Sequence, residues 1–115
     1  MDFSKFNKER LFDVNTDGFE FCKLATLYAA NPNATYPLDG FFMSSSQLGT
    51  HPVAIDAAGK RLIDLPAHLC DVFDAISSDV EAVAAIKNGT AGFMIYQYSA
   101  KNFNRVCHSI KFVNR

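Results

Sequence analysis

Five short runs of apolar and aromatic residues, each bounded by Gly, Pro, Asn or Ser, constrain the fold of this chain more than any other feature. Runs of this length and composition are typical of β-strands. Gly40 inside the first run predicts a bulge or a sharp bend. Gly59, between the second and third runs, is expected to supply the positive φ of a hairpin turn. The predicted strands cover residues 36–43, 53–56, 61–65, 92–99 and 105–114.

The segment between the third and fourth predicted strands has the spacing of helices. An apolar stripe at helical spacing consists of Leu69, Val72, Phe73 and Ile76. Ser78, followed three residues later by Glu81, fits a capping box for a second helical segment. Lys87 and Gly89 fit the end of that segment, with a cation in the last turn and Gly beyond it.

This order of elements predicts an α+β, mainly β fold in one domain, residues 1–115. Three strands, a helical segment and two strands is the chain order of an OB-fold, a five-stranded partly open barrel with its helix between strands 3 and 4. A generic α+β sandwich, with helix packed on antiparallel sheet, is the alternative. Residues 1–18 are expected to form an N-terminal arm or an edge element. Residues 19–31 fit both a strand and a helix.

Composition predicts a folded cytoplasmic protein with one hydrophobic core. Hydrophobic residues make up 49% of the 115 residues, which argues against disorder. No apolar run is long enough to span a membrane, and the polar N-terminus lacks the core of a secretory signal. The three cysteines are far apart and odd in number, so reduced thiols are expected: Cys22, Cys70 and Cys107.

Charge is distributed unevenly along the chain. Residues 1–82 carry six Lys and Arg against twelve Asp and Glu, a net charge of −6, whereas residues 83–115 carry five bases and no acid, a net charge of +5. Such asymmetry indicates an anionic partner for the basic part. The alternative is that the acidic and basic parts face each other within the fold.

No motif for catalysis or metal binding is complete. The sequence DVNTDG, residues 13–18, fits the first six positions of a calcium loop. The twelfth position, which should supply a bidentate Glu, is Leu24. A polar turn is therefore expected, without metal or cofactor. No nucleophile, base and orienting group occur in a recognised arrangement, so an enzyme is not expected.

Aromatic residues and cations are interleaved in the last two predicted strands. If Phe93 and Ile95 face the core, Tyr96 and Tyr98 stand outward in a row, because strand residues alternate between faces. Single-stranded nucleic acids bind to such surfaces by stacking bases on rings and placing phosphates beside cations. The predicted nucleic-acid-binding residues are Tyr96, Tyr98 and Phe103 for the bases, and Lys60, Arg61, Lys101, Arg105 and Lys111 for the phosphates. In the alternative interpretation both Tyr are core residues of an ordinary basic hairpin.

Three stretches carry a resemblance to known proteins: TYPLDGFFM, LIDLPAHL and IKNGTAGFMIYQY. From about residue 11 onward, the chain resembles small proteins encoded by phages and mobile elements of Gram-positive gut bacteria. The resemblance implies an accessory or replication-associated protein with an OB-like fold. Such elements also encode small inhibitors of host defence systems, which belong to a second class of function.

Two functions follow as hypotheses. The first is a non-catalytic protein that binds single-stranded DNA or RNA through its C-terminal strands. The second is a small protein–protein interaction module, in which acidic residues of the helical region meet a basic partner. The acidic candidates are Asp71, Asp74, Asp79 and Glu81. An exposed edge strand would also allow a homodimer.

Overall fold

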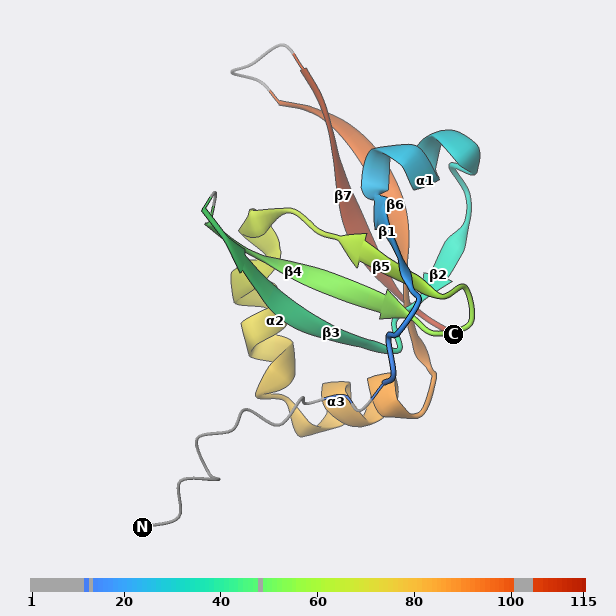
Figure 1. Ribbon diagram of the computed structural model, residues 1–115, viewed down its shortest axis with the longest axis vertical. Coiled ribbons are helices and arrows are strands. Elements are labelled where there is room, and N and C mark those ends of the chain that lie inside the picture. Colours follow the sequence, from blue (N-terminus) through green and yellow to red (C-terminus); the bar gives the residue numbers. More distant parts are fainter. Residues whose placement is uncertain (1–11, 13, 48, 101–104) are drawn as a thin grey trace.

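The computed structural model describes residues 12, 14–47, 49–100 and 105–115. Within these ranges the fold is mixed α+β (Figure 1). The strands form two sheets, and the helices form a separate layer. The elements in chain order are β1 (Glu20–Lys23), α1 (Leu24–Ala30), β2 (Thr35–Pro37), β3 (Gly40–Ser46), β4 (Gly49–Asp56), β5 (Arg61–Asp64), the 3₁₀ turn η2 (Ala67–Leu69), α2 (Cys70–Ser77), α3 (Val80–Lys87), β6 (Ala91–Ala100) and β7 (Arg105–Asn114).

The strands form two sheets. One has the order β1-β5-β4-β3 and the other the order β2-β6-β7. All pairs are antiparallel except β1 with β5, which is parallel. In the described part of the chain the sheets do not close into a barrel, so the predicted OB-like barrel is not confirmed. The physical reason is that β1, and not β7, pairs with the outer edge of β5.

The first predicted strand, residues 36–43, is in fact two strands that belong to different sheets. The Leu38 N–H donates to the carbonyl of Ala91 in β6 at 3.0 Å, and the Asp39 N–H donates to the carbonyl of Ile55 in β4 at 2.9 Å. The chain therefore crosses between sheets over a single peptide link. Gly40 follows this bend, and a Cβ there would lie 2.8 Å from the Cβ of Phe12.

The N-terminal part resolves the ambiguity of residues 19–31. These residues form a strand, β1, that leads directly into a helix, α1. Of the predicted arm, residues 1–11 and 13 lie outside the described residues. Phe12 is buried against Phe41, with ring centroids 5.0 Å apart, so the chain is already part of the core at that residue.

Two turns differ from expectation. In the β4–β5 turn Lys60, and not Gly59, has the positive φ, at 53°. Gly59 is required for space, because a Cβ there would lie 2.5 Å from Oδ2 of Asp56, whose Oδ1 accepts the Gly59 N–H at 2.9 Å. Residues 44–50, which lie between the first two predicted strands, belong mostly to β3 and β4. Ser45 pairs with Thr50, and their hydroxyl oxygens lie 3.1 Å apart, so polar side chains extend the β3–β4 hairpin.

Two helices lie between β5 and β6, as the sequence predicts. The N-cap of α3 is Asp79, whose carboxylate accepts the N–H groups of Glu81 and Ala82, so the predicted capping residue, Ser78, was wrong by one position. The described part of the chain contains no helix that is both long and apolar enough to cross a membrane.

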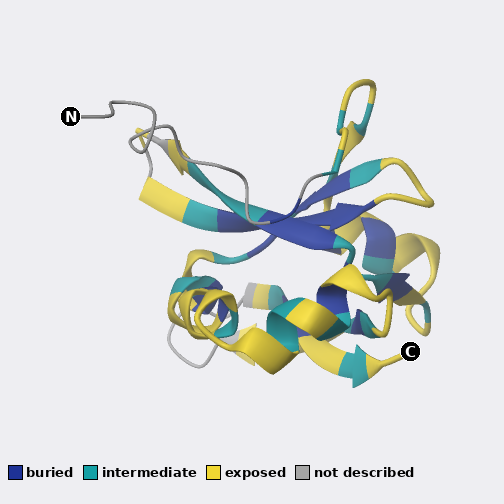
Figure 2. Cartoon of the chain, turned by 90° about the horizontal axis from the view of Figure 1, so that it is seen from below, coloured by how far each residue is buried: buried dark blue, intermediate teal, exposed yellow. Residues whose placement is uncertain are grey.

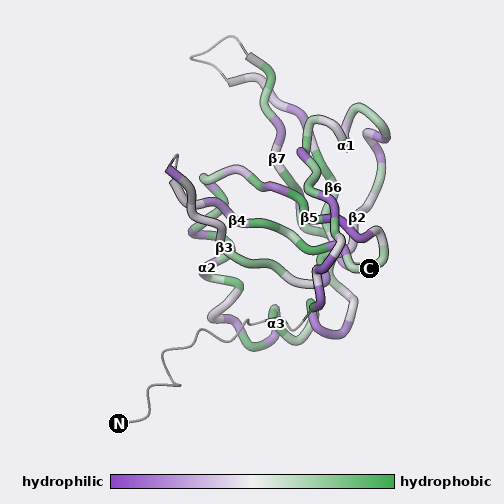
Figure 3. The backbone as a smooth tube through the Cα atoms, viewed as in Figure 1, coloured by the Kyte–Doolittle hydropathy of each residue, from purple (hydrophilic) through white to green (hydrophobic). Residues whose placement is uncertain are grey.

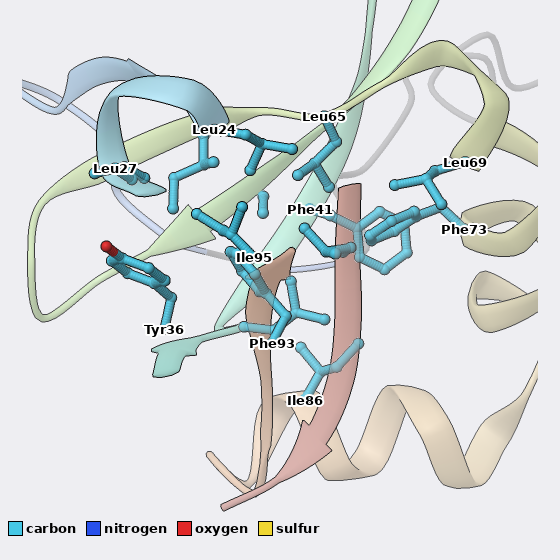
Figure 4. Close-up of a cluster of buried hydrophobic side chains, with 14 of the residues drawn as sticks. Leu24, Leu27, Tyr36, Phe41, Leu65, Leu69, Phe73, Ile86, Phe93 and Ile95 are labelled. Carbon is cyan, nitrogen blue, oxygen red and sulfur yellow. The ribbon is translucent and has the colours of Figure 1, made fainter. Parts of the chain in front are cut away.

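The larger of two hydrophobic clusters lies between the two sheets and α2 (Figure 4), and the smaller one consists of Val53, Ile55 and Leu62. The ring of Phe73 in α2 is fully buried and meets Phe41 edge-on, with ring centroids 4.8 Å apart. Tyr36 of β2 stacks on Phe93 of β6, with ring centroids 5.8 Å apart.

Burial is concentrated in the middle of the four-stranded sheet, and strand ends and outer helix faces are exposed (Figure 2). Hydropathy follows the same division, with hydrophobic residues along the middle of β4 (Figure 3).

Candidate nucleic-acid interface

The β6–β7 hairpin extends away from the body of the fold (Figure 1). Its strands pair continuously in antiparallel register from Ala91–Asn114 to Ala100–Arg105. Its two faces differ because side chains alternate along each strand. The inner face carries Phe93, Ile95 and Ile110, all buried in the core. The residues between them therefore form the outer face.

Two tyrosines stand side by side on this outer face. The side chain of Tyr96 is 45% exposed and that of Tyr98 is 37% exposed. Their ring centroids are 5.9 Å apart, and the ring planes meet at 43°. Tyr96 lies opposite Ser109, a buried residue whose Oγ is 3.3 Å from Nε2 of His68. Because directly opposed residues share a face, this contact ties β7 to η2 beside Tyr96.

Cations occupy the same face nearer the body of the fold. Lys111 is exposed and lies opposite Met94, diagonal to Tyr96, and diagonal neighbours on antiparallel strands lie about 7–8 Å apart. Arg115 continues the alternation of β7 and is exposed. Its side chain passes over Gly92, where a Cβ would lie 2.9 Å from Cδ of Arg115. Arg115 is not among the predicted binding residues, although its spacing from Lys111 by an even number of residues places it on the same face.

Lys60 and Arg61 do not belong to this surface. They lie at the β4–β5 turn, and the Arg61 guanidinium bonds Oδ2 of Asp56 at 3.2 Å and lies 5.7 Å from the ring centroid of Tyr36. Tyr36 is buried and stacks on Phe93, so the Arg61 contact lies on the inner face of β6, opposite to the tyrosine pair. The structure therefore does not bring these two predicted residues to the tyrosine pair, and the carboxylate of Asp56 already neutralises Arg61.

The remaining predicted residues, Lys101, Phe103 and Arg105, follow β6 in the sequence. Lys101 and Phe103 are outside the described residues. Arg105 is described only by its backbone pairing with Ala100. Their contribution to the surface remains a prediction.

The outer face carries no negative charge of its own. Residues 92–115 contain no Asp or Glu. Among the residues that the structure describes, an ion pair joins Arg61 to Asp56 and Nε2 of His51 lies 3.1 Å from Oδ1 of Asp64, and these contacts involve neither Lys111 nor Arg115. The positive charge of β7 is thus available to an anionic ligand.

Polar groups in the described ranges outside the hairpin include the calcium-like sequence and the Cys22 thiol. No three His, Cys, Asp or Glu side chains in those ranges gather around a common point. In the calcium-like sequence, the Asp17 N–H donates to Oδ1 of Asn15 at 3.0 Å, the geometry of a local polar turn. Burial raises the pKa of the Cys22 thiol, with a smaller contribution from the charge of Glu20. A raised pKa makes this thiol less reactive.

Comparison with protein-family models, with curated proteins and with solved structures finds no match to this chain.

Proposed function

We propose that this protein binds single-stranded nucleic acid, without catalysis, on the outer face of β6 and β7. One observation carries the proposal: two neighbouring tyrosine rings are exposed on the face that also carries Lys111 and Arg115, in a segment without Asp or Glu. Bases stack on the rings and phosphates lie beside Lys111 and Arg115. Each stacked base contributes about 1–3 kcal/mol to such complexes.

The geometry of the ring pair favours an extended, unstacked strand over a duplex. Stacked bases rise about 3.4 Å per step, whereas the ring centroids of Tyr96 and Tyr98 are 5.9 Å apart. Adjacent bases must separate from each other to lie on both rings, which a single strand does at low cost. The acidic remainder of the chain, residues 1–82 with a net charge of −6, disfavours the denser charge of a duplex.

The order of strand pairing supports an OB-like origin of the fold. We count β2 and β3 as one bent strand. That strand pairs with β4 and with β6, and β4 pairs with β5. The resulting arrangement is open between β5 and β7, which do not pair. OB-folds are partly open Greek-key barrels that bind oligonucleotides on one face and through the loop between strands 4 and 5. The corresponding connection here is the β6–β7 hairpin. An accessory or replication-associated role in a phage or mobile element, in the cytoplasm, accords with this proposal.

Fluorescence anisotropy with a labelled oligothymidylate of about 12 nucleotides tests the proposal. At about 50 mM salt the single strand should bind, and a duplex of equal length should bind more weakly. An oligouridylate of the same length distinguishes DNA from RNA preference. Absence of single-strand binding under these conditions, or equal affinity for the duplex, would refute the proposed function.

A further inference from the structure

A histidine from outside the hairpin lies at the proposed binding face. His68 belongs to η2 and is exposed. Its Nε2 is 3.3 Å from Oγ of Ser109 in β7. Ser109 pairs with Tyr96 across the hairpin, and the side chains of directly opposed residues share one face, with Cβ atoms about 4.5–5.5 Å apart. The imidazole of His68 therefore lies beside Tyr96.

The contact with Ser109 holds the imidazole ring in both of its charge states. A serine hydroxyl donates one hydrogen bond and also accepts, so Ser109 can accept from a protonated Nε2 or donate to a neutral one. Ser109 is 1% exposed, and this buried hydroxyl has its partner in His68. Among the described residues, Nδ1 of His68 takes part in no hydrogen bond or ion pair, so one ring nitrogen is left for a ligand.

No carboxylate forms an ion pair with His68 in the part of the chain that the structure describes. Asp71 is the nearest acid along the chain and is exposed to solvent. Lys111 lies two residues after Ser109, on the same face. Protonation of His68 therefore adds a positive charge to the face that carries Lys111. The described titratable and charged side chains of the elements packed against η2 are Cys107, His108 and Lys111 in β7, His51 and Asp56 in β4, and Cys70, Asp71 and Asp74 in α2.

We infer that His68 binds a phosphate of the nucleic acid when its imidazole is protonated, and that this contact makes binding stronger as the pH falls. Histidine is the side chain that ordinarily changes charge between about pH 5 and pH 8. The phosphate belongs to the nucleotide whose base stacks on Tyr96, because His68 lies beside that ring. This inference rests on the proposed nucleic-acid function, and it adds to the same face one residue from outside the hairpin whose charge depends on pH.

Anisotropy titrations of the full chain with labelled oligothymidylate at about pH 7.5 and about pH 5.5 test this inference. Neither thymine nor the phosphodiester changes charge between these values. The original chain should bind about threefold more tightly at the lower pH, the effect of one exposed charge contact. The slope of log K against log salt should also be larger in magnitude by about 0.7 at the lower pH. His68→Gln should bind like the original chain at the higher pH and should lose both changes.

Substitutions of the other two histidines are matched controls. His51 lies in β4, with Nε2 3.1 Å from Oδ1 of Asp64. His108 lies on the inner face of β7, where its ring centroid is 5.3 Å from that of Tyr28. His51→Gln and His108→Gln should keep the gain in affinity at the lower pH. His68→Lys carries a permanent charge and should bind at the higher pH as tightly as the original chain binds at the lower pH. Thermal unfolding at both pH values checks that each variant folds.

The outcomes separate failure of this inference from failure of the proposed function. A gain in affinity that His68→Gln abolishes and the two control substitutions keep supports both. Binding at the higher pH with no gain at the lower pH, or with an equal gain in His68→Gln, overturns the inference and leaves the proposed function standing. No binding of the original chain at either pH refutes the proposed function and the inference with it.

Discussion

The rings of Tyr96 and Tyr98 lie with their centroids 5.9 Å apart on the outer face of β6, and both are exposed to solvent. Buried residues on the inner face, Phe93 and Ile95, fix this orientation, because a shift of one residue in register would move the aromatic core to the surface. The position of the two rings is therefore determined by the packing of the hairpin against the core.

Replacing each of these tyrosines by Ala should weaken oligothymidylate binding by about 1–3 kcal/mol, because each substitution removes one stacking surface. The slope of log K against log salt should not change, since no cation is removed. Phe21→Ala is a matched control: Phe21 is a 62% exposed aromatic residue on β1, in the other sheet. An equal loss of affinity in that control would show that the effect is not specific to the hairpin.

Replacing Lys111 or Arg115 by Ala should reduce the magnitude of the salt slope by about 0.7 for each phosphate that the protein no longer neutralises. Both residues lie on the face that carries the tyrosines, whereas Lys23, an exposed cation on β1, lies in the other sheet. Lys23→Ala is therefore expected to leave the slope unchanged. Salt titrations of the three variants measure this directly, and a uniform effect of all three would point to non-specific attraction.

The N-cap contact of α3 predicts how substitutions at two neighbouring positions change the free energy of unfolding. Asp79→Ala should lower the free energy of unfolding by about 1 kcal/mol, because the carboxylate accepts two N–H groups of the first turn. Ser78→Ala at the preceding position should have an effect smaller than about 0.5 kcal/mol. Urea denaturation of both variants compares the two positions. The reverse order of effects would restore Ser78 as the capping residue.

The geometry of the β4–β5 turn predicts how substitutions at Gly59 and Lys60 change stability. Gly59→Ala should destabilise the fold by about 1–3 kcal/mol, since the new methyl group would overlap the carboxylate of Asp56. Lys60→Gly should change stability little. Relief of the positive φ at Lys60, about 1 kcal/mol, offsets the added freedom of Gly in the unfolded chain, about 0.5–1 kcal/mol. Thermal unfolding of the pair measures both, and a larger loss for Lys60→Gly would contradict the turn geometry.

The sequence predicts local elements well and their non-local pairing poorly. The last two predicted strands, 92–99 and 105–114, nearly match β6 and β7, because alternation and turn residues are local signals. The parallel pairing of β1 with β5 joins residues about forty positions apart and leaves no local signal. For the same reason the split of residues 36–43 between two sheets was not predicted.

In the candidate site, too, local features could be predicted from the sequence and non-local contacts could not. The outward direction of Tyr96 and Tyr98 follows from alternation once the core residues are identified. The exclusion of Arg61 depends on its contacts with Asp56 and with Tyr36 on the inner face of β6, which only the tertiary structure supplies. The place of Arg115 on the outer face follows from the same alternation, because it lies four residues after Lys111.

Intrinsic fluorescence tests the central claim most directly, because the chain has four Tyr and no Trp. Titration with unlabelled oligothymidylate should quench the emission of Tyr96 and Tyr98 as bases stack on their rings. In a variant with Tyr96→Phe and Tyr98→Phe, anisotropy of a labelled strand should still report binding, and the quenching should disappear. Quenching that persists in this variant, or no response of the original chain to the strand, would contradict a nucleic-acid-binding surface built on these two rings.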